Sequence, residues 1–364
     1  MNWLQNVWYV AGFESELAEA DTVARRFLGT PVVMYRASSG ELAALEDLCP
    51  HRLMPLSFGK RVGDELQCGY HGLRFSTHGQ CTLAPGQDTP PAKACVRTFP
   101  LVARHGLLWV WLGERERADV ALVPDVHWND DPAWAASRGY HHIEADFRLS
   151  NDNLLDLAHE SYVHTKTIGN VEEEAIADFP LNVSVEGEGL VRAHREMPNI
   201  VPPPFFAMVL DHQGRIDRWQ TAIHVAPSFN MTDFGVYPVG SPRAGAFRSH
   251  VLHLLTPETE RSTHYFWSLT RNYRLQDEAL TESIRKAIDA TFSEDAVVLQ
   301  TQQRQLDIHG GNVPRTAIKL DEAPGRARRL LEGLVRRESR EPDFVFRPPI
   351  MVGEAVPERE TSFA

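Results

Sequence analysis

Two short runs, Cys49-Pro50-His51-Arg52 and Cys68-Gly69-Tyr70-His71-Gly72, decide how the N-terminal part of this 364-residue chain is interpreted. Each run contains one thiol and one imidazole, and sixteen residues separate the histidine of the first run from the cysteine of the second. Two sulfur and two nitrogen ligands suit a [2Fe–2S] cluster in which the cysteines hold one iron and the histidines hold the other. The expected cluster ligands are therefore Cys49, His51, Cys68 and His71.

This mixed ligand set is the Rieske type, in which two neutral imidazoles replace two thiolates and raise the reduction potential. Structural zinc is the chemical alternative, because it also accepts mixed cysteine and histidine ligands. Zinc modules, however, usually pair like ligands closely, as in Cys-x2-Cys. Four unrelated core residues are the other alternative, but two tight Cys/His pairs at this separation favour the cluster.

The sequence around these runs predicts a small antiparallel β domain. From the N-terminus to about residue 113, short β-rich runs such as 31–36 and 107–112 alternate with Gly, Pro and Asp. Both ligand pairs would then lie at the tips of neighbouring hairpins. Pro50 stiffens its loop, and the glycines of the second run allow backbone amides to approach the cluster.

The rest of the chain predicts an α+β domain with a curved antiparallel sheet around a long C-terminal helix. Helical patterns are expected at 277–308 and 324–338, and the expected strands are 182–193, 217–226, 229–237, 247–255 and 262–270. The expected domains are a cluster domain at 1–115, a catalytic domain at 116–340 and a C-terminal tail at 341–364.

Composition narrows the class of protein. Hydrophobic residues make up 43% and charged residues 24% of the chain, which is ordinary for a globular enzyme. The net charge of −12 argues against general affinity for nucleic acid or for an anionic membrane. The N-terminus lacks the pattern of a secretory signal and no apolar run is long enough to span a bilayer, so we expect a cytoplasmic protein.

A second metal site is expected where a helical pattern at about 150–160 ends. His159 and His164 lie five residues apart, so both imidazoles can reach one metal if the helix ends or bulges between them. A carboxylate would complete the 2-His-1-carboxylate triad of non-haem Fe(II) oxygenases. We assign that role to Asp295, although spacing alone does not separate it from Glu294. Two other acids on the same helix compete, namely Glu282 and Asp289.

Two polar residues precede these histidines at helical spacing. Asp156 lies three residues before His159, so a continuous helix would place both on one face, where the carboxylate would orient the imidazole. Asn153 lies three residues earlier and is expected to face the iron without binding it strongly.

With these motifs, the chain resembles the oxygenase components of Rieske non-haem iron oxygenases, and among them the aromatic O-demethylases. The resemblance runs nearly end to end and includes the stretches 6–11, 152–157 and 255–260 as well as the ligand runs. It implies a Rieske [2Fe–2S] cluster, mononuclear Fe(II) and a helix-grip (SRPBCC-type) catalytic domain. It also implies a ring-shaped homotrimer in which Asp156 bridges a cluster histidine of one subunit to an iron histidine of the next.

The resemblance further implies a monooxygenase that uses O2 to O-demethylate a methoxybenzoate such as vanillate, releasing formaldehyde. Asn230 and His253 match positions that bind a substrate carboxylate in one member of the family. Electrons would come from a separate NAD(P)H-dependent flavin and iron–sulfur reductase, because this chain has no Gly-x-Gly-x-x-Gly fingerprint. The alternatives are methyl hydroxylation or ring dihydroxylation of another aromatic carboxylate or sulfonate, and, from a different class, a Rieske electron-transfer protein.

Overall fold

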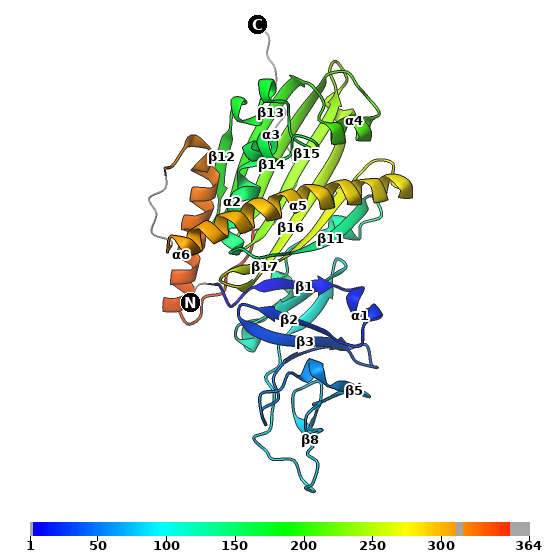
Figure 1. The fold of residues 1–364 in the computed structure, drawn as a ribbon, viewed down its shortest axis with the longest axis vertical. Coiled ribbons are helices and arrows are strands. Elements are labelled where there is room, and N and C mark those ends of the chain that lie inside the picture. Colours follow the sequence, from blue (N-terminus) through cyan, green and yellow to red (C-terminus); the bar gives the residue numbers. More distant parts are fainter. Residues whose placement is uncertain (1–2, 311–315, 350–364) are drawn as a thin grey trace.

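The computed structural model describes residues 3–310 and 316–349. Figure 1 shows two lobes stacked along the long axis of the molecule, a blue and cyan N-terminal lobe below a green-to-orange C-terminal lobe. The N-terminal lobe contains β1 to β10, and the C-terminal lobe contains the elements from β11 to α6. The mixed α+β architecture expected from the sequence is confirmed.

The N-terminal lobe consists of three small antiparallel sheets and one short helix, α1 (Glu16–Glu19). The first sheet has the order β1 (Trp8–Phe13), β10 (Leu107–Trp111) and β9 (Leu101–Arg104). The second has β2 (Val23–Phe27), β3 (Thr30–Arg36) and β4 (Leu42–Glu46). The third has β5 (Lys60–Val62), β6 (Glu65–Gln67), β7 (Arg74–Phe75) and β8 (Cys81–Leu83).

Strand β10 joins the two lobes because both of its faces are buried. Leu108 and Val110 pack into the core of the N-terminal lobe. Leu107, Trp109 and Trp111 point the other way, into a core that they share with the large sheet of the C-terminal lobe. Side chains alternate between the faces of a strand, so a run of five apolar residues serves two cores.

The C-terminal lobe is built on one seven-stranded antiparallel sheet in the order β11-β17-β16-β15-β14-β13-β12. Its strands are β11 (Ala135–Ile143), β12 (Asn182–Glu186), β13 (Leu190–Ile200), β14 (Ile216–Val225), β15 (Phe229–Pro238), β16 (Phe247–Thr259) and β17 (Ser262–Arg271). The helices beside it include α2 (Phe147–Leu155), α3 (Glu160–Val163), α4 (Pro204–Leu210) and α5 (Glu278–Ile308).

Helix α5 crosses one face of this sheet (Figure 1). Its buried positions recur every three or four residues, which is the period of a helix that faces a core. They are Leu280, Ile284, Ile288, Thr291, Phe292, Asp295, Leu299 and Gln303. Asp295 therefore occupies a core-facing position of the helix, whereas the side chain of Glu294 is 36% exposed.

Helix α6 (Glu322–Arg340) and the residues after it fasten the C-terminus to the N-terminal lobe. Leu331, Leu334, Phe344 and Phe346 pack into the core of that lobe. The carboxylate of Glu338 accepts hydrogen bonds from the backbone of residues 5 and 6, both at 2.8 Å. Within the expected tail, Phe344 and Phe346 are thus packed against the protein, and 350–364 lie outside the described residues.

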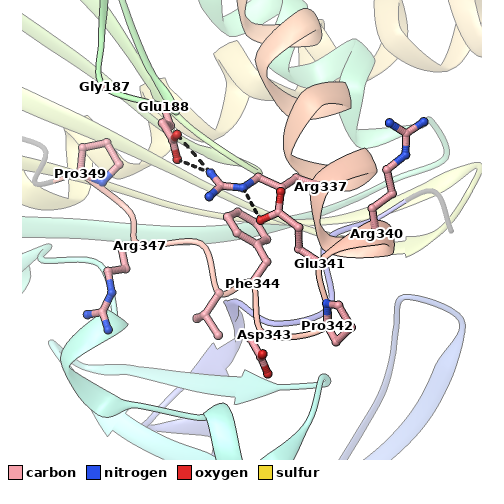
Figure 2. Close-up of a pocket in the computed structure, with 11 residues that line it drawn as sticks. Gly187, Glu188, Arg337, Arg340, Glu341, Pro342, Asp343, Phe344, Arg347 and Pro349 are labelled. Carbon is pink, nitrogen blue, oxygen red and sulfur yellow. Dashed lines mark hydrogen bonds and ion pairs between the residues drawn. The ribbon is translucent and has the colours of Figure 1, made fainter.

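A surface hollow lies beside this C-terminal segment (Figure 2). Arg337 reaches between the carboxylates of Glu188 and Glu341, at 2.9 and 2.8 Å, and lies over the ring of Phe344. Its charge is therefore used in holding the C-terminal segment to the β12–β13 hairpin.

Three local features differ from the sequence expectation. The expected strand 182–193 is the hairpin of β12 and β13, which turns where Gly187 adopts a φ of 58°. Helix α4 was not expected. The helix expected over 150–160 ends at Leu155. Within the described ranges, no helix combines the length and apolar character that crossing a bilayer would require.

Candidate metal centres and substrate cavity

The two cysteines of the opening motifs lie in loops with the same backbone geometry. The amide of Cys49 donates to Met54 O and its carbonyl accepts from the amide of Leu53, at 2.8 and 2.9 Å. Cys68 repeats the pattern with Leu73 and Gly72, at 2.8 and 3.1 Å. The fifth residue of each loop has a positive φ, 58° in the first loop and 76° in the second. Glycine adopts that conformation without strain, which explains its place in the second loop.

The loops separate the thiols from the imidazoles. Cys49 and Cys68 are 1% and 2% exposed, within the core under the loops. Burial, together with the neighbouring thiol of Cys68, raises the pKa of Cys49. His51 and His71 are exposed, with ring centroids 4.5 Å apart. A buried sulfur pair beside an exposed nitrogen pair fits the two unlike irons of a Rieske cluster.

The break after α2 brings the second pair of histidines together. A 3-10 turn (Leu157–His159) follows the helix, and α3 begins directly after it. His159 and His164 therefore bracket α3, and their Nε2 atoms lie 3.3 and 3.2 Å from Oδ1 of Asp295 on α5. In the part of the chain that the structure describes, these three residues are the one group of three or more His, Cys, Asp or Glu side chains whose ligand atoms all lie within 4.8 Å of one another.

Each imidazole is oriented through its other nitrogen. Nδ1 of His159 hydrogen-bonds to the backbone carbonyl of Asp156 at 2.5 Å, and Nδ1 of His164 to Oε2 of Glu294 at 2.7 Å. Partners of this kind fix the tautomer and aim Nε2 at a metal. The sequence expectation for Asp156 was wrong in this respect. Because α2 ends before Asp156, its carbonyl contacts the imidazole, and its carboxylate accepts from the amide of Ala158 instead.

The charges of these residues are strongly coupled, as expected of a site that could hold a cation. Burial alone would favour neutral His159, but the ion pair with Asp295 outweighs it and raises the pKa of His159 to about 9. Burial would likewise raise the pKa of Asp295, yet the two imidazoles hold it well below its usual range. A buried carboxylate stabilised by positive charge, with two nitrogens aimed at it, matches the donor set of a mononuclear Fe(II) site.

A largely apolar cavity opens beside these three residues. Asn153 lines it, with Nδ2 3.1 Å from Oδ1 of Asp295 and 3.3 Å from Nε2 of His159. The apolar lining residues are Leu154, Leu157, Ile168, Phe205, Phe234, Val251, Ile288 and Phe292. The polar ones, besides Asn153 and the three candidate ligands, are Glu160, Arg218, Gln220, Thr232 and His253. An apolar pocket with a few polar groups is typical of a site for an aromatic molecule.

The structure treats the two expected substrate residues differently. His253 lines the cavity, where its ring bonds to Thr232 Oγ1 at 3.2 Å and to the hydroxyl of Tyr265 at 2.6 Å. Burial lowers the pKa of His253 to about 3, so its ring is neutral. Asn230 is opposite His253 on the neighbouring strand but is not among the lining residues. Its amide is engaged by His224 and Asn151, both at 2.8 Å, so the expectation for Asn230 is not supported.

Sequence reasoning missed several residues of the site. Glu294 was weighed only as a rival ligand, whereas it orients His164. The helical period of α5 could have separated the two acids, because Asp295 continues the buried stripe. Arg218 and Gln220 carry no comparable signal, since β14 is buried along nearly its whole length.

Comparisons with known proteins agree with this geometry. Residues 7–100 match the family described as Rieske [2Fe-2S] domain, and residues 143–337 match the family described as Vanillate O-demethylase oxygenase C-terminal domain. The chain belongs to the Rieske non-haem iron oxygenases. It therefore carries a Rieske [2Fe–2S] cluster and a mononuclear iron, with His159, His164 and Asp295 as the candidate iron site.

Individual members of the Rieske oxygenase family are similar over almost the whole chain. The vanillate O-demethylase oxygenase subunit of a Pseudomonas species is 37% identical over 351 residues, 93% of this chain and 97% of that protein. Crystal structures of dicamba monooxygenase are also similar. The one bound to 3,6-dichlorosalicylic acid has a TM-score of 0.87 and 34% identity, covering 93% of this chain and all of that chain. The one with non-heme iron and dicamba has a TM-score of 0.79.

The protein is therefore an oxidoreductase of the monooxygenase type, and its relatives are oxygenase components of multi-component systems. The match of residues 143–337 to an oxygenase domain leaves the electron-transfer alternative without support.

Proposed function

We propose that this protein is the oxygenase component of an aromatic-acid O-demethylase acting on a methoxybenzoate such as vanillate. The observation that carries the proposal is the 2-His-1-carboxylate group beside a largely apolar cavity. The similarity to vanillate O-demethylase oxygenase subunits supports this choice of substrate class.

We assign the cluster to the two loop motifs, Cys49 with Cys68 on one iron and His51 with His71 on the other. His159, His164 and Asp295 are the ligands of the mononuclear iron. When bound, these groups supply single electrons and activate O2 for insertion into a C–H bond.

The chain's own residues position the substrate and the ligands. The apolar walls of the cavity would exclude water and hold the aromatic ring with its methyl group toward the metal side. Asn153 would keep the carboxylate of Asp295 directed at the metal. Hydroxylation of the methyl group gives a hemiacetal that collapses to a phenol and formaldehyde. The reaction consumes one O2 and two electrons with two protons, and it also releases one water.

We further propose that the electrons come from a separate NAD(P)H-dependent flavin and iron–sulfur reductase in the cytoplasm. Figure 1 places β5 and β8, the outer strands of the sheet whose β6–β7 connection is the second cluster loop, at the end of the N-terminal lobe that points away from α3 and α5. That arrangement favours transfer between subunits of a homotrimer, with Asp156 bridging a cluster histidine and His159. We retain the division into domains 1–115 and 116–340 and a tail at 341–364.

A substrate panel with a matching reductase tests the proposal. Methoxylated, methylated and sulfonated benzoates should be compared for coupled consumption of NADH and O2. Stoichiometric formaldehyde from a methoxybenzoate is the expected result. A cis-diol, or hydroxylation of an aryl methyl group with no demethylation, would instead place the protein among the dihydroxylases or methyl hydroxylases.

A further inference from the structure

One wall of the cavity carries a buried polar group to which the proposed reaction gives no role. Arg218 and Gln220 on β14 and Glu160 on α3 are 2%, 3% and 3% exposed. Nη2 of Arg218 donates to Glu160 Oε2 at 2.9 Å, and Nε2 of Gln220 donates to Glu160 Oε1. An ionised carboxylate only accepts hydrogen bonds, so the amide nitrogen of Gln220 must face it. The amide oxygen is therefore directed elsewhere.

Two atoms of this group remain without a partner. In the described part of the chain, neither Nε of Arg218 nor Oε1 of Gln220 has a hydrogen-bond partner, although both atoms are buried. Leaving such a group unpaired costs about 1–3 kcal/mol. The two residues are separated by one position on β14, so their side chains lie on the same face, and both line the cavity. Because both residues line the cavity, the pair would present a bound substrate with one N–H donor and one C=O acceptor.

The chemistry of the pair selects its ligand. A hydroxyl group can donate to Gln220 and accept from Arg218 at the same time. An ether or an ionised carboxylate can only accept, and would leave Oε1 of Gln220 unpaired. A carboxylate would also meet the negative charge of Glu160, which already balances the charge of Arg218.

We propose that Arg218 and Gln220, held in place by Glu160, recognise a neutral hydroxyl group on the substrate's aromatic ring. This inference rests on the proposed function and narrows it to hydroxylated methoxybenzoates. A site that hydrogen-bonds a substrate hydroxyl discriminates strongly against the analogue that lacks it, because its own polar groups then stay unpaired.

The test compares 4-hydroxy-3-methoxybenzoate with 3-methoxybenzoate on the metal-loaded protein. Calorimetry gives the Kd of each acid, and formaldehyde release gives kcat/KM. We expect the acid without the hydroxyl to bind about 10- to 100-fold more weakly. Equal Kd values in the wild-type protein would overturn the proposal without any variant.

A variant assigns the preference to the residue. Gln220→Met removes the acceptor, so the ratio of the two Kd values should fall to within about threefold. The matched control is Thr221→Val, on the opposite face of the same strand, where the hydroxyl bonds to His194 at 2.8 Å. It should keep the wild-type ratio. If a Gln220→Met protein that retains its iron keeps the wild-type ratio of the two Kd values, the assignment of the preference to Gln220 is overturned.

The two hypotheses fail in different ways. Equally efficient formaldehyde release from both acids would leave the demethylase function standing and reject the role of Arg218 and Gln220. A clear preference for the hydroxylated acid in Kd, with no formaldehyde from either acid, would support that role and reject the demethylase function.

Discussion

Replacing Glu294 by alanine tests whether iron affinity depends on the orientation of His164. Glu294 Oε2 accepts a hydrogen bond from His164 Nδ1 at 2.7 Å, which holds Nε2 toward Asp295. Without the carboxylate, the imidazole is free to turn or to change tautomer. We therefore expect Glu294→Ala to fold and to keep its cluster, but to bind Fe(II) less tightly.

The size of the effect follows from the contact. A hydrogen bond to a charged group contributes about 1.5–3 kcal/mol. The Glu294 side chain is 36% exposed, so solvent screening puts the expected loss near the lower end, at about 1.5–2 kcal/mol. That corresponds to about 10- to 30-fold weaker Fe(II) binding. Glu294→Gln keeps an accepting oxygen and should fall between the wild type and Glu294→Ala.

The assay is a titration of the mononuclear site with Fe(II) after selective removal of that iron, with the cluster followed by its visible absorption. Asp295→Ala removes a ligand and should reduce iron from about three to about two atoms per chain. Glu282→Gln, on the exposed face of the same helix, is the matched control and should bind iron normally. Unchanged affinity in Glu294→Ala, or a larger loss there than in Asp295→Ala, would refute the assignment of these two acids.

Three further predictions concern electron transfer, pH and the C-terminal segment. Asp156→Asn keeps an acceptor for the amide of Ala158, so the cluster and the mononuclear iron should remain bound while turnover with the reductase falls at least ~10-fold. Normal turnover would contradict the proposal that Asp156 bridges the two metal centres. Burial lowers the pKa of His224 to about 4, so only the unfolded chain takes up its proton between pH 6.5 and 5. Because of His224, the free energy of unfolding should therefore fall by ~2 kcal/mol over that range. The urea midpoint of His224→Gln should fall less over the same range. If the substitution leaves this pH dependence unchanged, the prediction is wrong. Phe346→Ala should reduce the free energy of unfolding by about 3–5 kcal/mol and lower the melting temperature, because Phe346 is 2% exposed in the core shared with the N-terminal lobe. An unchanged melting temperature would mean that residues 341–349 do not stabilise that lobe.

The candidate metal ligands could be singled out from the sequence because their chemistry is local. Each cluster loop places a thiol and an imidazole within four residues, and the spacing of His159 and His164 already limits how they can share a metal. The long strands and α5 were predictable for a similar reason, since burial repeats with the period of the element. The prediction of a single strand at 182–193 was wrong, because only one residue, Gly187, marks the turn that divides this segment into two strands.

Other parts of the site depended on where separate elements meet. The end of α2 at Leu155 decides that the carbonyl of Asp156, rather than its carboxylate, contacts His159. No local pattern in the sequence distinguishes these two arrangements.

The sequence by itself determined the redox cofactors and the general architecture of this Rieske oxygenase, because ligand type and periodicity are properties of short segments. The tertiary structure alone decided that Glu294 supports His164, and that Arg218 and Gln220 share a cavity wall with Glu160. Those relations join β14, α3 and α5, which are far apart in the chain. They exist only because the sheet and α5 bury their apolar faces against each other, which brings the polar side chains on those faces within hydrogen-bonding distance.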